Sequence, residues 1–571
     1  MTDTPSTCLP EFELQSERME ALPVINHFLK RLRLQDLLHR RLPAPDGRCK
    51  VPACTVLSVL LRNLVLGRAP LYSLSEWSTG IAPQALGLTR RQMQALNDDR
   101  IGRALDELFD ADRQALLTEF VLGMIREFRI DLSRLHNDST SLSLQGCYRE
   151  GDGRTVRGQP TARIAFGYNK DHRPDLKQLL WILTVSSDGA VPVCFKVTDG
   201  SVEDSTTHID TWNLLRQLTG RPDFLYIADS KLCTFEALGH IDRQGGGFLT
   251  PLPRSRKEDP LFREWLRSHC PDWREIGRRR RPGQPVDVIQ ALESPIAEAQ
   301  GFRLLWFLSS RKLELDAAER QHALMRADRQ LDLLKAKLQG PRCRFKQRNR
   351  VARAVQSILE RTGTARWIDY QLEHKNETIY RQEKSKSKKR PIRLRSFMRS
   401  KFLLRWSPNL KTIHQDSRCD GISPLLTNRG DLSSWALYCA YHDHQTFLEQ
   451  RHDLLKNTLQ VTPAYLHSVS RLEAFLFLEY LALTVHALIE RQIRRKMARR
   501  QIQHLPLYPE ARKCKAPTAA RVFAIFEHVQ MHTLRAHGKP VQHFPPQLTP
   551  LQKQLLALLD VPIDCFSPGY R

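Results

Sequence analysis

The 571-residue chain lacks the cysteine patterns that mark a disulfide-rich or zinc-binding protein. Its twelve cysteines are scattered without a CxxC pair, and neither Cys49 nor Cys54 has a second pair or a histidine partner at zinc-ligand spacing. This distribution is typical of a protein whose thiols stay reduced. We therefore expect a cytoplasmic protein without a structural zinc site.

Long hydrophobic runs and targeting segments are also missing. The N-terminal residues do not show the basic-then-apolar pattern of a secretory signal, and no lipid-anchor motif is present. The most apolar runs, 56–66 and 474–489, are shorter than the roughly 20 residues that span a bilayer, and polar residues interrupt both. We expect both runs to form buried helices and the protein to have no membrane partner.

Acidic side chains are too few to balance the basic ones. The chain has 88 Lys and Arg against 62 Asp and Glu, which gives a formal net charge of +26. Residues 376–405 hold eleven basic residues against two acids, and residues 491–515 hold nine against one. A charge run is commonly a solvated face, but two such runs favour contact with the phosphates of nucleic acid. The candidate DNA-contacting residues there are Lys388, Lys389, Arg390, Arg494, Arg495 and Lys496.

Changes in the apolar pattern divide the chain into several domains, as its length leads one to expect. The first segment has helical periodicity and is either a DNA-end-binding module or a packing bundle. The second mixes strands with a helix, and the fourth resumes that pattern after an insertion, so we predict a mixed α/β core. The last segment is a basic, largely helical tail. The five segments are 1–127, 128–245, 246–410, 411–500 and 501–571.

Three carboxylates on separate elements stand out. Asp138 lies within a strand-like segment, and Asp229 directly follows the apolar strand 224–228. Glu449 lies on an amphipathic helix with Lys456 seven residues further on. Three such carboxylates are typical of sites that hold two divalent cations and cut phosphodiester bonds.

Each carboxylate also has an ordinary structural explanation. Asp138 fits an edge strand in which its carboxylate bonds to Ser139 or Thr140, and Asp229 fits the N-cap of a following helix. Glu449 fits the solvated face of an amphipathic helix. At about 100° per residue, one face of that helix holds His442, Gln445, Glu449 and Lys456 within an arc of roughly 60°. Combined in one basic chain, the three carboxylates favour a functional site over these alternatives.

Several motifs resemble those of bacterial insertion-sequence DDE transposases. They are Asp138-Ser-Thr, the run 167–178, Tyr226-Ile-Ala-Asp229, the run 420–428 and Lys515-Ala-Pro-Thr-Ala-Ala-Arg521. The chain is most similar to the insertion-sequence-four-like superfamily, in the branch with an extra helical N-terminal domain. The resemblance covers nearly the whole chain, and its most specific part is the twelve-residue run 167–178.

The resemblance implies an RNase H-like core, interrupted by a mostly β insertion, in which Asp138, Asp229 and Glu449 hold two magnesium ions, with manganese as a substitute. It implies a bacterial, nucleoid-associated enzyme that cuts DNA at the terminal inverted repeats of its own element and joins the 3′ ends to target DNA. A homodimer is expected to hold the two ends together. By their residue types alone, Arg173 and Lys177 can reach a phosphate group of the DNA, and Lys456 can neutralise a phosphate near the cut.

The family pattern on the glutamate-bearing helix is only partly present. Glu449 and Lys456 fit it, whereas His442 and Gln445 stand where tyrosine and arginine are expected, and Tyr441 is one place off. Other carboxylates that could take the place of the glutamate are Asp443, Glu473 and Glu479. Two rival functions remain open: a nuclease of the same fold without strand transfer, and a DNA-binding remnant without catalysis.

Overall fold

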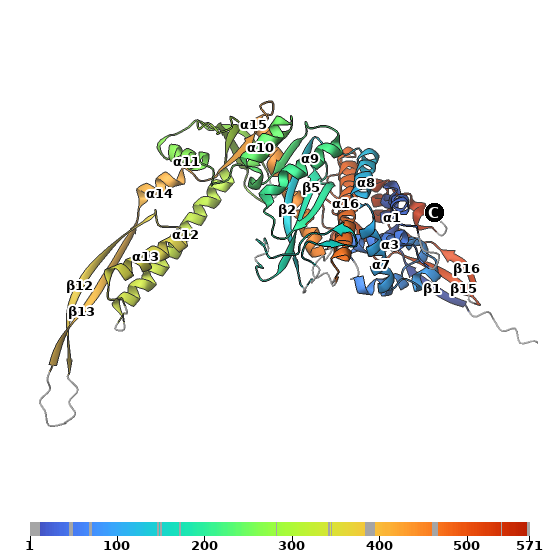
Figure 1. Ribbon diagram of the computed structural model, residues 1–571, viewed down its shortest axis with the longest axis horizontal. Helices are drawn as coiled ribbons and strands as arrows, with labels where there is room; N and C mark the ends of the chain where they lie inside the picture. The colour runs from blue at the N-terminus through green and yellow to red at the C-terminus, as the bar shows by residue number, and fades with distance from the viewer. Residues whose placement is uncertain are drawn as a thin grey trace, which may run out of the picture. The chain divides into compact units, whose positions relative to one another are not determined.

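The computed structural model shown in Figure 1 describes residues 12–567, apart from 45–48, 68–70, 146–147, 149–150, 169, 171–172, 281–282, 341–342, 344, 383–393, 459–465, 467 and 538. The chain divides into two compact units. One consists of Met1–Thr250 with Cys439–Arg571, and the other of Pro251–Tyr438. All three candidate carboxylates belong to the first unit, so the architecture of that unit determines the geometry of the site.

A mixed sheet with the strand order β6-β5-β2-β7-β8 runs through the first unit. The central strand β2 is antiparallel to β5 and parallel to β7, which in turn is parallel to β8. β5 and β6 form a hairpin, because they pair antiparallel on either side of residues 187–190. The strands are β2 (Arg134–Leu144), β5 (Lys177–Ser186), β6 (Pro192–Asp199), β7 (Leu225–Ala228) and β8 (Gly247–Pro251).

Helices precede this sheet along the chain. Asn97 caps α7, since its side-chain oxygen accepts a hydrogen bond from the backbone N–H of Arg100 at 2.9 Å. The apolar stripe of α7 is buried. The helices are α1 (Leu22–Arg31), α2 (Leu34–Arg41), α3 (Ala53–Leu66), α4 (Leu74–Thr79), α5 (Pro83–Leu86), α6 (Arg90–Gln94), α7 (Asp98–Asp110) and α8 (Arg113–Phe128).

The N-terminal segment is not wholly helical, which corrects the sequence-based expectation. β1 (Phe12–Arg18) pairs antiparallel with β15 (Gln530–Ala536), and β16 (Lys539–Phe544) completes a three-stranded sheet. The C-terminal tail therefore contains strands besides α17 (Ala519–Ile525) and α18 (Pro550–Leu559). The sequence does not predict β1 because most of its residues are exposed, so buried and exposed positions do not alternate along it. Its partner strand also lies more than 500 residues away.

The long helix α16 (Val469–Arg499) forms the centre of the first unit, where it packs against α1, α3, α7, α18 and β6. The prediction that residues 474–489 form a buried helix is confirmed. By length and composition, α16 is apolar enough to cross a membrane, but 94% of its apolar window is buried inside the protein. That burial fits the core helix of a globular unit.

The second unit contains four strands in the order β14-β11-β10-β9 and a separate long hairpin. Two of its strands lie between residues 287 and 309, and a long charged helix follows them directly. The elements are α11 (Glu258–Ser268), β9 (Arg274–Arg279), β10 (Asp287–Glu293), β11 (Arg303–Ser309), α12 (Ser310–Gln339), α13 (Arg348–Thr362), β12 (Ile368–Gln382), β13 (Leu394–Pro408), α14 (Leu410–Ser417) and β14 (Ile422–Thr427).

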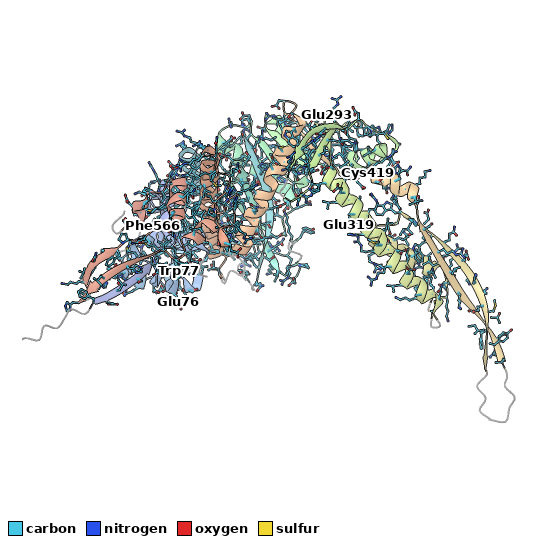
Figure 2. All side chains as sticks on the ribbon, turned by 180° about the vertical axis from the view of Figure 1, so that it is seen from behind. Glu76, Trp77, Glu293, Glu319, Cys419 and Phe566 are labelled. Carbon is cyan, nitrogen blue, oxygen red and sulfur yellow. The ribbon has the colours of Figure 1, made fainter. Side chains whose placement is uncertain are left out.

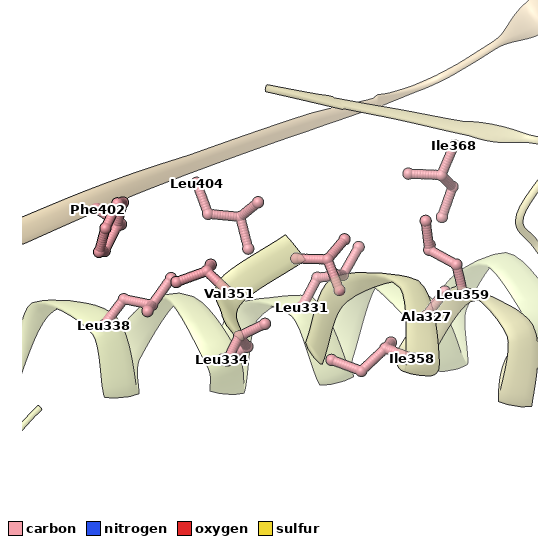
Figure 3. Close-up of a cluster of buried hydrophobic side chains, with 11 residues drawn as sticks. Ala327, Leu331, Leu334, Leu338, Val351, Ile358, Leu359, Ile368, Phe402 and Leu404 are labelled. Atoms are coloured by element: carbon pink, nitrogen blue, oxygen red, sulfur yellow. The ribbon is translucent and has the colours of Figure 1, made fainter. Parts of the chain in front are cut away.

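A small core joins the hairpin of this unit to its two long helices. Figure 3 shows leucines of α12, such as Leu331 and Leu338, facing Val351 and Leu359 of α13 and the strand residues Phe402 and Leu404. The apolar stripe along α12 makes this packing possible. β14 pairs antiparallel with β11, and residues 411–438 belong to this compact unit.

Candidate functional site

Asp138 and Asp229 lie side by side on neighbouring strands of the first unit. The parallel register aligns Asn137 of β2 with Ala228 at the end of β7, so the next residue of each strand is the aspartate. The hydrogen bonds of both ordinary roles considered from the sequence are also present, although β2 is a central strand and not an edge strand. The backbone N–H of Ser139 donates to Asp138 at 2.8 Å, and that of Lys231 donates to Asp229 at 3.0 Å, at the N-cap of η3 (Ser230–Leu232).

The two carboxylates share a cavity of about 260 Å3. Its walls come from β2, β7, the segment that contains Lys170, and the helix α15 (Ser434–Asp453). The lining residues are His136, Asn137, Asp138, Lys170, Ile227, Ala228, Asp229, Tyr441 and Leu448. Two carboxylates, an ammonium group and a phenol therefore converge on a space that is large enough for ions and a phosphate group.

The electrostatics of the pair favour a bound cation. Burial raises the pKa of Asp138, and Lys170 only partly offsets that effect. Burial also raises the pKa of Asp229, and the charge of Asp138 raises it further. Burial and the repulsion between the two carboxylates thus both disfavour the ionised form of the pair. A cation bound between them would offset both effects.

Lys170 supplies a positive charge beside the two carboxylates. Its Nζ lies 3.7 Å from Oδ1 of Asp138 and 3.3 Å from Oδ2 of Asp204, and it donates to the backbone oxygen of Ser139 at 2.5 Å. The hydroxyl of Ser139 donates to Asp204 at 2.8 Å, so Asp204, at the start of η2 (Asp204–Thr207), is a third carboxylate of this network. Neither Lys170 nor Asp204 was singled out from the sequence.

His452 and Tyr441 approach the pair from α15. Nε2 of His452 lies 3.7 Å from Oδ2 of Asp138. Burial, together with the charges of Lys170 and Lys456, lowers the pKa of His452 to about 3, so its ring is neutral. Burial and the nearby carboxylates raise the pKa of Tyr441, which keeps its hydroxyl protonated and able to donate a hydrogen bond.

Glu449 does not line this cavity. Its side chain is exposed on α15, although its charge contributes to the raised pKa of Tyr441. In the parts of the chain that the structure describes, no group of three or more His, Cys, Asp or Glu side chains is arranged to hold a metal ion. The structure therefore brings Asp138 and Asp229 together but does not add Glu449 to them.

The alternative carboxylates do not line the cavity either. Glu473 forms an ion pair with Arg113 at 2.9 Å and accepts a hydrogen bond from the N–H of Ala162 at 2.8 Å, so it ties α16 to α8. Glu479 is fully buried in α16, and burial raises its pKa well above the usual value. Asp443 is exposed on α15.

The helical face predicted from Glu449 to Lys456 is interrupted. α15 ends at Asp453 and continues as a π-helical turn, η4 (Leu454–Thr458), that contains Lys456. A π turn holds more residues than an α turn, so the rotation of 100° per residue used to define the helical face does not apply across this turn. Leu448 and Leu455 are buried, and Lys456 is half-buried.

The basic residues proposed for DNA contact differ in their surroundings. Arg173 is exposed and forms two hydrogen bonds with Asp175, whereas Lys177 lies at the start of β5. Arg494 donates to the carbonyl of Pro517, Arg495 lies 3.9 Å from Asp188, and Lys496 lies 3.0 Å from Asp560. These three cations therefore take part in contacts within the unit. Lys388, Lys389 and Arg390 lie outside the described residues.

The residues at the cavity fit a divalent metal ion by their chemistry. Carboxylate oxygens are the ligands that magnesium and manganese prefer, and two of them are present with raised pKa values. The unpaired ring nitrogens of His452, which have no hydrogen-bond partner among the described residues, add a further donor beside Asp138. A third carboxylate would still have to approach for the full set expected from the sequence.

Comparisons with known proteins add two findings. Residues 14–122 match the family model described as a domain of unknown function, DUF4277. Among solved structures, the chain is similar to the piggyBac transposase in its synaptic complex with hairpin DNA, at 10% sequence identity and a TM-score of 0.26. That match covers 52% of this chain and 60% of the transposase, which is less than two thirds of its length. No curated protein matches the chain.

The scope of these matches is narrow. The family model covers only the N-terminal region, and the structural likeness is weak. Neither supports the insertion-sequence-four-like branch in particular. The mixed α/β architecture of the core is established by its own strands and helices.

Proposed function

We propose that this chain is a DNA transposase whose cutting site is built on Asp138 and Asp229. The observation that carries the proposal is the placement of these two carboxylates on adjacent parallel strands, within one cavity that also holds Lys170 and Tyr441. The strongly basic composition supplies the preference for a polyanionic substrate. The motifs that resemble those of insertion-sequence transposases support transposition as the reaction.

In this proposal the core is RNase H-like and the chain belongs to the insertion-sequence-four-like superfamily. Asp138 and Asp229 would hold magnesium or manganese ions, and Glu449, which lies outside the cavity, would have to approach them to complete the coordination. When bound, two such ions lower the pKa of a water molecule and stabilise the leaving 3′ oxygen. The protein acts as a homodimer on the terminal inverted repeats of its element, in the nucleoid of a bacterial cytoplasm.

The remaining side chains position the phosphodiester. The ammonium group of Lys170 offsets negative charge beside Asp138 when the DNA backbone enters. The protonated hydroxyl of Tyr441 donates a hydrogen bond toward a phosphate oxygen, which its raised pKa permits at neutral pH. Lys456, Arg173 and Lys177 extend the basic path for the DNA. The freed 3′ hydroxyl then attacks a phosphodiester bond of the target DNA in the same site, formed by the same carboxylates.

The test uses the full chain and duplex DNA taken from both flanks of its coding region. Nicking and strand transfer are read on denaturing gels with and without magnesium, for the wild type and for Asp138→Asn, Asp229→Asn and Glu449→Gln. Asp223→Asn, an exposed carboxylate in the same unit, is the matched control. We expect cutting by the wild type and the control, and loss of at least about a thousandfold in the three variants.

Other outcomes separate the alternatives. Cutting that persists in Asp138→Asn and Asp229→Asn discards the site. Cutting that persists only in Glu449→Gln moves the third ligand to another carboxylate, with Asp443 and Asp204 as the next choices. A second candidate function, a DNA-binding remnant, is favoured by the position of Glu449 outside the cavity. It predicts DNA binding by the folded wild type without any metal-dependent cutting.

A further inference from the structure

A second cavity of the first unit contains a buried arginine without a carboxylate partner. Four arginines of the described chain are buried, and they differ in how their charge is balanced. Three form ion pairs, namely Arg100 with Glu107, Arg451 with Glu490, and Arg491 with Asp188. Arg62, with 8% of its surface exposed, forms no ion pair with any carboxylate in the described part of the chain. Burial alone lowers its pKa, to about 10, so it is charged at neutral pH.

Neutral groups hold the guanidinium of Arg62 in a fixed orientation. Its Nε donates to Oδ1 of Asn26 at 2.7 Å, and one terminal nitrogen donates to the backbone oxygen of Ser58 at 2.8 Å. Asn26 is fixed in turn, because its Nδ2 donates to the carbonyl of Ala85 at 2.8 Å. A buried cation without a counter-charge is costly, and these dipoles offset only part of the cost. An anion that enters the cavity would offset the remainder.

The cavity has a volume of about 760 Å3, within the range of small-molecule sites. Besides Arg62, the basic residues His27, Lys30 and Arg33 line it, against one carboxylate, Asp36. Nε2 of His27 is buried without a hydrogen-bond partner among the described residues, which adds a second unsatisfied polar group. Apolar and amide side chains complete the lining, among them Leu29, Leu34, Leu88, Gln84 and Gln92.

Two parts of the chain that are far apart in sequence enclose this space. Most of the lining comes from α1, α2, α3 and the turns around α5 and α6, and the remainder comes from Cys565 and Ser567. The C-terminal segment is anchored there by Phe566, labelled in Figure 2, which is buried and stacks on Phe526 with ring centroids 5.7 Å apart. The cavity is separate from the one that holds Asp138 and Asp229.

We propose that this cavity binds a nucleoside phosphate, with the phosphate on Arg62 and the base against the apolar wall. A guanidinium fork matches the oxygens of a phosphate group, and the cationic lining gives the site its preference for an anion. Leucines beside amide groups suit a flat ring with polar edges. The ligand is either a free nucleotide or a nucleotide displaced from the end of a DNA strand. Residues 14–122, which match a domain of unknown function, supply most of the binding site.

The test measures binding by calorimetry with the full chain in the absence of divalent metal, so it does not depend on DNA cutting. The ligands are deoxyadenosine monophosphate, deoxyadenosine and inorganic phosphate. We expect the nucleotide to bind and the nucleoside to bind at least about tenfold more weakly. Arg62→Gln should weaken nucleotide binding at least about tenfold, and Arg62→Lys should recover part of it. Lys553→Ala, an exposed lysine on α18, should leave it unchanged.

A further variant guards against the possibility that loss of Arg62 unfolds the unit. Arg33 is exposed at the cavity, and Arg33→Ala should weaken nucleotide binding about threefold without affecting stability. Competition with a duplex that carries an unpaired, 5′-phosphorylated end nucleotide identifies a DNA source, and failure of that duplex to compete identifies a free nucleotide. Absence of nucleotide binding by the folded wild type, or binding that neither Arg62→Gln nor Arg33→Ala weakens, overturns the proposal.

Discussion

Nζ of Lys170 lies 3.7 Å from Oδ1 of Asp138, which places a fixed positive charge beside one of the two central carboxylates. The same ammonium group donates to the backbone of Ser139, so the contact is part of the fold as well as of the site. A divalent cation bound by Asp138 and Asp229 would experience repulsion from this charge. In the proposed site, Lys170 would therefore weaken the binding of an ion by the two carboxylates.

The first prediction concerns Lys170→Gln. Removing one positive charge a few ångströms from the carboxylates should strengthen the binding of manganese about tenfold, since that corresponds to about 1.4 kcal/mol of Coulomb energy in a partly solvated site. Manganese affinity can be measured by calorimetry on the full chain. Lys196→Gln, which removes an exposed lysine of β6 with a surface partner, should leave it unchanged. An affinity that is unchanged in Lys170→Gln would place the cation elsewhere.

The sequence was sufficient to find the two aspartates because local patterns carry them. The strand-like segment around Asp138 and the apolar run before Asp229 predict strands, and the adjacency of those strands then brings the carboxylates together. Lys170, Asp204 and His452 have no such local signal. They reach the site through loop closure and through the packing of α15, which depend on contacts between distant segments.

The unmet expectation at Glu449 also has a physical origin. The side of α15 that carries Tyr441 and Leu448 lines the cavity, so Glu449 is left on the exposed side of the helix. The π turn after Asp453 in addition separates Lys456 from the face of Glu449. The buried residues Arg451 and His452 are polar, so a sequence pattern based on apolar residues assigns them to the solvated face. The surroundings of Arg62 could not be predicted from the sequence either, because an arginine inside an apolar run gives no indication of which residues contact its side chain.

The second prediction compares two glycines. A Cβ at Gly200 would lie 1.9 Å from the backbone oxygen of Gln178, in the packing of the segment that precedes Lys170. Gly200→Ala should therefore destabilise the unit by at least about 2 kcal/mol, because backbone must move. At Gly123, exposed within α8, nothing lies within 4 Å of an added Cβ. Gly123→Ala should stabilise the protein by up to about 1 kcal/mol. Denaturant unfolding of both variants gives the two values, and equal effects would contradict the prediction.

The third prediction is a pH dependence that originates at His486. Its Nε2 donates to the carbonyl of Val65 at 2.8 Å, and burial lowers its pKa from 6.5 to about 4. The unfolded chain therefore binds this proton more readily than the folded one. Stability from this group is complete above pH 6.5 and is lost as the pH falls toward 4.

Between pH 7 and pH 5, His486 should account for a loss of about 2 kcal/mol in the free energy of unfolding. His486→Gln retains a donor for the carbonyl of Val65 but cannot take up a proton, so its stability should fall by that much less over the same interval. The comparison requires urea unfolding of both proteins at the two pH values. Equal losses in the wild type and the variant would show that His486 does not carry this dependence.

The fourth prediction concerns the buried ion pair of Arg451 and Glu490, whose atoms lie 2.9 Å apart. Burial acts to raise the pKa of Glu490, but Arg451 and Arg494 outweigh it, and the pKa is lowered. Arg451 also donates to the carbonyl of Ala190 at 3.1 Å, so this pair fixes α15 against the sheet two residues beyond Glu449. Arg451→Met should destabilise the protein by about 3–5 kcal/mol, since it leaves a buried carboxylate without its partner.

A double-mutant cycle separates the pair from general packing. Glu490→Leu alone should also destabilise, whereas the double variant should lose much less than the sum of the single losses, because it leaves no unpaired buried charge. Arg221→Met removes an exposed partner of Asp223 and should change stability by no more than about 0.5 kcal/mol. Strictly additive losses at Arg451 and Glu490 would mean that the two charges act independently, and that other contacts hold the helix that carries Glu449 in place.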